Sequence, residues 1–108
     1  MTPVINVVQH PGILDSTTAD NFLQAIDTAA QSNPDILLFD MSETSFIDSS
    51  GLGTIVSVMK QVRERNVAFY VCSPNAQVKI VFDLSNIHQA FPIFENRDAF
   101  EQAVLQQA

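Results

Sequence analysis

The residues that could carry chemistry are concentrated in one short run, Asp-Ser-Ser-Gly-Leu-Gly, at positions 48–53. Two hydroxyl side chains, Ser49 and Ser50, directly follow the carboxylate of Asp48. Serine is a common N-cap residue, because its side-chain oxygen accepts a hydrogen bond from a free N–H of the first helical turn. A hydroxyl at the positive end of a helix is a good place to attach a phosphate. We therefore expect a phosphorylation site in this run.

Two elements must hold the run in place. Residues 36–39, Ile-Leu-Leu-Phe, are an unbroken apolar segment, which is typical of a strand buried on both faces of a parallel sheet. Residues 50–65 repeat apolar side chains at helical spacing, which predicts a helix. Gly51 and Gly53 should permit unusual backbone dihedrals and close approach of neighbouring segments. We interpret residues 41–48 as a loop that Phe46 and Ile47 anchor to the core.

The rest of the chain alternates between strand and helix patterns. Runs of β-branched and apolar residues predict a strand at 3–8, which bends at Pro11 and Gly12 and resumes at 13–14. Similar runs predict a strand at 67–72 and a short edge strand at 91–94. Asn96 should cap a last helix near the end of the chain.

The starts of two further helices are predicted from capping residues. Thr17 and Asp20 form a variant of the capping box in front of a helix over 18–30. Ser73 followed by Pro74 predicts an N-cap and a first-turn proline for a third helix. The buried side of that helix would include Leu84.

This order of elements predicts an α/β fold. We expect a mixed, largely parallel sheet of four to five strands with about four helices. Strands ending near residues 14, 39 and 72 would point to one edge of the sheet, where such sheets usually bind. That edge would bring together Asp15, Thr17, residues 40–50 and Ser73. The length predicts a single domain over residues 1–108.

The charge balance narrows the class of partner. Five basic residues stand against twelve acidic ones, a net charge of -7, which argues against nucleic acid and fits protein partners with basic surfaces. No apolar run reaches the length of a membrane helix, and the N-terminus lacks the pattern of a signal peptide. The single cysteine, Cys72, cannot form an internal disulfide. These features predict a cytoplasmic protein without membrane insertion.

The sequence contains no pattern typical of an enzyme. The serines lack the Gly-x-Ser-x-Gly elbow of a serine hydrolase, and residues 51–53 lack the lysine of a nucleotide-binding phosphate loop. No cluster has metal-ligand spacing. We therefore expect no catalytic activity, no metal and no cofactor, and keep a small nucleotide-binding protein as a less favoured alternative.

Several segments together resemble one known family. The stretch 46–53, Phe-Ile-Asp-Ser-Ser-Gly-Leu-Gly, follows an apolar strand and looks like the signature of the STAS domain, in particular of bacterial anti-sigma factor antagonists. Four flanking segments resemble the family pattern in the same order, namely Gly12-Ile13-Leu14-Asp15 with Thr17-Thr18-Ala19, Asp40-Met41-Ser42, Cys72-Ser73-Pro74 and Val81-Phe82-Asp83-Leu84-Ser85. The resemblance covers nearly the whole chain and implies one STAS domain.

The resemblance implies a phosphorylation-controlled binding protein. In that family, the serine after the aspartate is phosphorylated by a partner anti-sigma factor that is also a serine kinase, and a PP2C-type phosphatase removes the phosphate. The unphosphorylated form binds the kinase and frees the sigma factor. The acceptor would be Ser49, with Ser50 as the fallback. The implied partner-binding residues are Asp15, Thr17, Asp48, Ser49, Ser50, Gly51, Leu52 and Gly53.

Two questions stay open from the sequence. The chain could instead be an unmodified STAS subunit of a lipid-transport or stress-signalling assembly. In addition, the first confident strand lies close to the N-terminus, so the leading edge strand of many relatives is short or missing. The loss of that strand would expose a sheet edge or change self-association, and a homodimer is one option.

Overall fold

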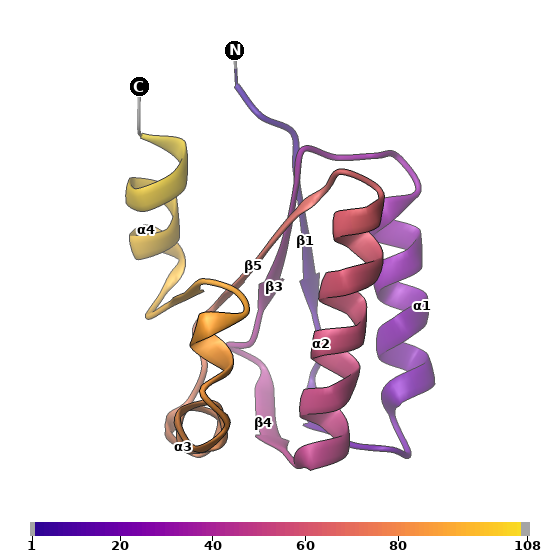
Figure 1. Ribbon diagram of the computed structural model, residues 1–108, viewed down its shortest axis with the longest axis vertical. Helices are drawn as coiled ribbons and strands as arrows, with labels where there is room; N and C mark the ends of the chain where they lie inside the picture. Colours follow the sequence, from indigo (N-terminus) through magenta and orange to yellow (C-terminus); the bar gives the residue numbers. More distant parts are fainter. Residues whose placement is uncertain (1, 107–108) are drawn as a thin grey trace.

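The computed structural model describes residues 2–106 and has an α/β fold (Figure 1). The main sheet contains β1 (Ile5–Gln9), β3 (Ile36–Asp40), β5 (Ala68–Cys72) and β6 (Ile93–Phe94), in the order β1-β3-β5-β6. A second sheet pairs β2 (Gly12–Leu14) with β4 (Thr44–Ile47). All of these pairings are parallel. The predicted fold class is thus confirmed.

The helices are distributed over both faces and one end of the main sheet. Figure 1 shows α1 (Ala19–Ala30) and α2 (Ser49–Glu64) side by side on one face. On the opposite face lies α4 (Arg97–Phe100), which continues as a π-helical segment, η2 (Glu101–Leu105). The third long helix, α3 (Ala76–Ser85), packs on β4 and leads into a 3-10 turn, η1 (Ile87–Gln89). No helix within residues 2–106 is long and apolar enough to cross a membrane.

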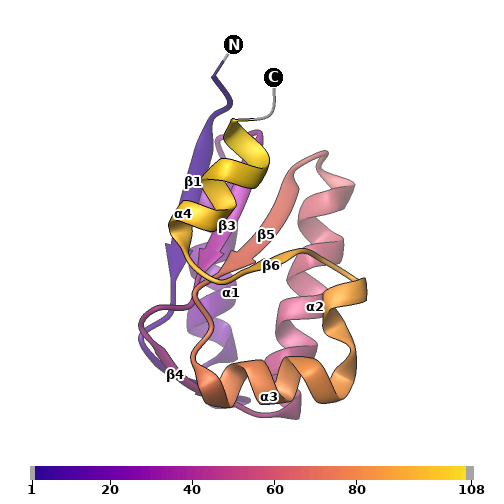
Figure 2. The ribbon, with the colours of Figure 1, turned by 90° about the vertical axis from the view of Figure 1, so that its left-hand side faces the viewer.

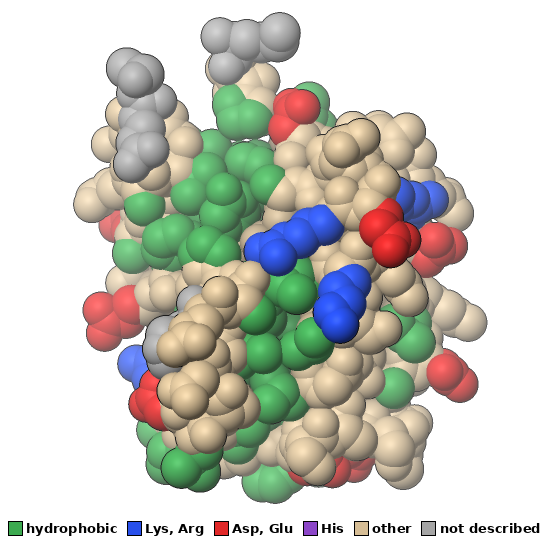
Figure 3. Space-filling view, in the orientation of Figure 1, with side chains coloured by type: hydrophobic (Ala, Val, Ile, Leu, Met, Phe, Trp, Pro, Cys, Tyr) green, Lys and Arg blue, Asp and Glu red, His purple; other side chains and the backbone are tan. Residues whose placement is uncertain are grey.

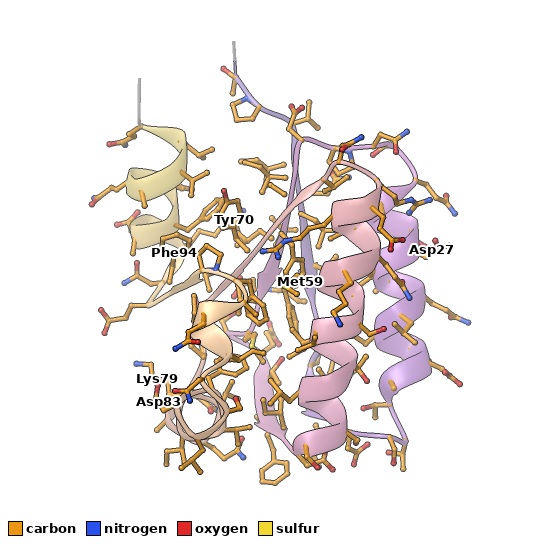
Figure 4. The ribbon with its side chains drawn as sticks, in the orientation of Figure 1. Asp27, Met59, Tyr70, Lys79, Asp83 and Phe94 are labelled. Atoms are coloured by element: carbon orange, nitrogen blue, oxygen red, sulfur yellow. The ribbon has the colours of Figure 1, made fainter. Side chains whose placement is uncertain are left out.

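The core lies on both sides of β3, whose five residues are all buried. Between the main sheet and α1 and α2, Phe22 and Phe39 pack with ring centroids 4.7 Å apart. On the other face, Tyr70 and Phe94 lie together under α4 (Figure 4), and Cys72 is buried nearby. The prediction that the apolar segment is covered on both faces is confirmed.

The interpretation of residues 41–48 as a loop is wrong, because β4 lies within them. This strand is short, and only its first and last residues, Thr44 and Ile47, are buried. Phe46 is 43% exposed, so it does not anchor the segment to the core, whereas Ile47 does. The residues after Gly12 also do not rejoin the first strand's sheet, because β2 pairs with β4 instead.

The predicted start of the third helix is wrong by two residues. Ser73 has φ +62°, in the left-handed region, and is not a cap. Asn75 is the N-cap instead, and its side chain accepts a hydrogen bond from the N–H of Val78 at 2.9 Å. Leu84 is 81% exposed, so it does not belong to the buried side of α3.

Candidate functional site

The two-stranded sheet places two acidic turns next to each other. In its register Leu14 lies opposite Ile47, so the following residues, Asp15 and Asp48, leave the ends of neighbouring parallel strands. The charge of Asp48 acts on Asp15 and opposes its ionisation, although other contacts outweigh this effect. The structure therefore brings together Asp15 and Asp48, two of the residues that the family resemblance implies for partner binding. Ser73 is not at this sheet's end, since it follows β5 and its N–H bonds to Phe94 of the main sheet.

Contacts around His10 join the starts of the two short strands. The hydroxyl of Thr44 donates to the carbonyl of His10 at 2.7 Å, and the N–H of Gly12 donates to the carbonyl of Glu43 at 3.0 Å. The His10 ring is buried and lies 2.8 Å from the carbonyl oxygen of Ile13. These bonds fix the entry of both short strands.

The other edge of β4 is held by two amide side chains of α3. Gln77 accepts from the N–H of Ile47 at 3.0 Å and donates to its carbonyl at 2.9 Å, so its amide acts as one rung of an added strand. The Asn75 amide donates to the carbonyls of Thr44 and Ser45 at 3.3 and 3.0 Å. Sequence reasoning missed both residues, although an asparagine just after Pro74 is a recognisable alternative cap.

The residue that starts α2 is Asp48, so the prediction of a serine N-cap is wrong. Its carboxylate accepts from the N–H of Gly51 at 2.9 Å and from the hydroxyl of Ser50 at 2.8 Å. These two hydrogen bonds hold the pKa of Asp48 below its ordinary value. An ionised carboxylate is also favoured by the partial positive charge of the helix N-terminus.

The two serines have different surroundings. Both are exposed, but the Ser50 hydroxyl is committed to Asp48, while Ser49 is the first residue of α2. Within residues 2–106, the Ser49 hydroxyl has no hydrogen-bond partner. Ser49 therefore presents a hydroxyl that is not engaged by Asp48.

Asp15 forms a second acidic turn through local hydrogen bonds. Its carboxylate accepts from the hydroxyl of Thr17 at 2.6 Å and from the N–H of Thr17 at 2.9 Å, and these bonds lower the pKa of Asp15. The predicted capping box of Thr17 and Asp20 is wrong. Thr18 occupies the N-cap position and makes no side-chain cap, because its hydroxyl donates to the carbonyl of Ile13 at 2.8 Å.

The two glycines of the motif have different roles. A Cβ on Gly51 would lie 2.1 Å from the carbonyl oxygen of Leu14, so the first turn of α2 contacts the end of β2 directly. The predicted close approach is confirmed there. At Gly53 a Cβ would meet nothing within 4 Å. Neither glycine has a positive φ, so the predicted unusual dihedrals are wrong. Leu52 between them is half-buried against the main core.

An apolar pair lies beside the acidic turns. Ile13 and Phe46 are partners in the register of the two-stranded sheet, and they are 47% and 43% exposed. On the face seen in Figure 3, the basic side chains near α2 gather over the C-terminal half of that helix and not over its N-terminal end. The site therefore combines two carboxylates, a free hydroxyl and an apolar flank.

Comparison with known proteins identifies the family. The chain belongs to the STAS domain family, whose model matches residues 2–100. It is 30% identical over 91 residues to the anti-sigma F factor antagonist of Paenibacillus polymyxa, covering 83% of this chain and 78% of that protein. This places the chain among the relatives of anti-sigma factor antagonists, as the motif predicts.

Solved structures support the same fold. The crystal structure of an anti-sigma factor antagonist from Mycobacterium paratuberculosis matches with a TM-score of 0.83 at 24% identity, covering 98% of this chain and 94% of that one. The anti-sigma factor antagonist SpoIIAA, solved in its unphosphorylated form, matches with a TM-score of 0.71 at 20% identity. This match covers 100% of this chain and 95% of that one. At these identities the likeness establishes the fold.

Proposed function

We propose that the protein is an anti-sigma factor antagonist switched by phosphorylation of Ser49. In this proposal the unphosphorylated form acts in the cytoplasm, where it binds a partner anti-sigma factor that is also a serine kinase and so releases the partner's target. A PP2C-type phosphatase restores the binding form. The observation that carries the proposal is the contrast between the free hydroxyl of Ser49 and the bonded hydroxyl of Ser50.

The electrostatics around Ser49 give the phosphate a large effect on docking and a small effect on folding. At the first position of α2 a phosphate is favoured by the helix N-terminus, by about 0.3–1 kcal/mol. It also adds about -1.5 to -2 charges near Asp15 and Asp48. Both carboxyls are ionised at neutral pH, because the ordinary pKa of 3.8 is already far below it and their pKa values are lower still. A partner surface shaped for two carboxylates would have to accommodate this additional charge.

The chemistry of the site indicates what the partner must offer. Asp15 and Asp48 require basic groups opposite them, and the net charge of -7 favours association with a basic surface. Ile13 and Phe46 would bury their exposed apolar area against a nonpolar patch of the partner. Phosphorylation would disturb this arrangement locally, without a change of fold.

Binding measurements with matched charge variants test the proposal. The partner kinase is first isolated from native cells by its binding to the wild-type protein. Ser49→Asp should then weaken binding to this kinase more than about a hundredfold, which corresponds to about 3 kcal/mol. Ser57→Asp adds the same charge at an exposed position of α2, about 12 Å further along the helix axis, and should leave binding within about threefold. Ser49→Ala should bind as the wild type does. Equal binding of Ser49→Asp and Ser57→Asp would contradict the proposal.

A further inference from the structure

The outer edge of β1 is unpaired within residues 2–106. This strand is the first in the order of the main sheet, and Figure 2 shows it at one side of the sheet. The carbonyl of Val4 accepts from the N–H groups of Asp35 and Ile36, at 2.9 and 3.1 Å, so its backbone groups face β3. Because backbone groups along a strand alternate between its two sides, those of Ile5, Val7 and Gln9 point away from the sheet.

A groove runs beside this edge. Its volume is about 500 Å³, and it lies between β1 and α1. The lining includes Val7, Val8 and Gln9 of the strand and Ala25 and Thr28 of the helix, and none of the lining side chains is charged. A strand added to β1 would therefore lie against a neutral surface that is partly apolar.

The edge also lacks the features that usually prevent strand addition. Such features are charged side chains, proline and bulges. The sequence of β1 is Ile-Asn-Val-Val-Gln, with no charge and no proline, and its five residues pair with β3 without a register shift. Val7 is 37% exposed, and Val4 just before the strand is 57% exposed. An uncharged extended segment would fit this edge.

We propose that a second copy of the chain supplies that segment, by antiparallel pairing of the two β1 strands about a two-fold axis at Val7. In this register Val7 of each copy lies opposite Val7 of the other, and each Ile5 lies opposite the other copy's Gln9. Every outward backbone group then finds a partner, and the two main sheets join into one.

The charge distribution favours a second copy over a different protein. Each chain carries a net charge of -7, so most of its surfaces would repel another copy. Neither β1 nor the lining of its groove carries a charged side chain, and β1 itself is an uncharged segment with two valines and an isoleucine, as such an edge requires. A basic partner would find no carboxylate in the groove lining. Closed two-fold pairs are also the commonest form of self-association.

Cross-linking at Val7 tests the proposed register. Residues that exchange both hydrogen bonds across an antiparallel pair have Cα atoms about 5.5 Å apart, within the span of a disulfide or a short bismaleimide. Val7→Cys should give a covalent species of about twice the 11.9 kDa of one chain. Leu84→Cys, an exposed control on α3, should form no covalent dimer and run at the mass of one chain under denaturing conditions, as should the wild type, whose Cys72 is buried. Equal cross-linking of Val7→Cys and Leu84→Cys would overturn the register.

The mass of the uncross-linked protein tests the interface itself. The wild type should sediment as a dimer, and added salt should not weaken the dimer, because no charged contact is involved and salt screens the repulsion between the two chains. Val7→Pro removes an outward N–H and should give a folded monomer, since proline is tolerated on a free edge. Val7→Lys, which keeps the backbone donor, should also give a monomer. A wild type that is monomeric at all concentrations, or a Val7→Lys variant that stays dimeric, would overturn the proposal, whatever the outcome for Ser49.

Discussion

The main sheet and the two-stranded sheet differ in how they are held together. The main sheet is stabilised by burial: β3 has no exposed residue, and aromatic rings pack on both of its faces. In the two-stranded sheet only Leu14, Thr44 and Ile47 are buried. Hydrogen bonds from the Gln77 side chain of α3, and from the Thr44 hydroxyl to the carbonyl of His10, support its strands. An isolated pair of short strands is marginal in water. The two-stranded sheet, where we propose recognition, therefore depends more on polar contacts and less on burial than the main sheet does.

The largest expected effect distinguishes the two sheets by burial. Phe39→Ala should lower the free energy of unfolding by about 3–5 kcal/mol, because it leaves a cavity in the fully buried strand. Phe46→Ala makes the same chemical change at a side chain that is 43% exposed. It should lower the free energy of unfolding by less than half as much as Phe39→Ala does. Urea denaturation of both variants measures the difference. Equal losses would mean that the two-stranded sheet has a core of its own.

The next effect concerns the contact between α2 and β2. Gly51→Ala should destabilise the protein by about 1–3 kcal/mol, because the new Cβ would overlap the carbonyl of Leu14 and force the helix start to move. Gly53→Ala is the matched control, two residues further into the helix with open space around it, and should stabilise by about 0.4–1 kcal/mol. Thermal unfolding of both variants should show a lower midpoint for Gly51→Ala and a higher midpoint for Gly53→Ala than for the wild type. A stabilising Gly51→Ala would contradict the close approach.

A smaller effect is expected for the amide that pairs with β4. Gln77→Ala should lower the free energy of unfolding by about 1–2 kcal/mol, since it removes both hydrogen bonds to Ile47. Lys79→Ala, on the exposed side of the same helix, should change it by less than about 0.5 kcal/mol. Hydrogen exchange of the Ile47 amide should also accelerate only in Gln77→Ala. If exchange there is unchanged, the amide does not support the strand.

The smallest effect is the pH dependence of the two acidic turns. The pKa values of Asp15 and Asp48 are lower in the folded protein than their ordinary value of 3.8. Their ionised forms therefore stabilise the fold above that pH, and this contribution is lost as the pH falls through the lower, folded-state pKa values. Asp48→Asn keeps an N-cap side chain but does not titrate. The stability of the Asp48→Asn variant should fall less steeply than that of the wild type below about pH 4. Unfolding midpoints measured for both proteins at a series of pH values would show this difference. Parallel pH curves would contradict the role of Asp48.

The main sheet was more predictable from the sequence than the region of the site. Residues 36–39 are apolar without a break, so their burial follows from composition alone. The strand β4 has four residues of mixed polarity, and its existence depends on hydrogen bonds from residues about 30 positions away. Local patterns cannot reveal such partners. Residue types similarly favoured a serine as the N-cap of α2, whereas the geometry assigns the N-cap to Asp48.

The most direct test of the account is peptide mass spectrometry of the protein isolated from its native cells under several growth and stress conditions, with Ser49→Ala and Ser50→Ala variants in parallel. The account predicts one phosphate on Ser49, absent from Ser49→Ala and retained in Ser50→Ala, because the Ser50 hydroxyl is held by Asp48. Phosphate on Ser50 alone would contradict the assignment of the acceptor. No phosphate under any condition would contradict the switch and favour an unmodified subunit of a larger assembly.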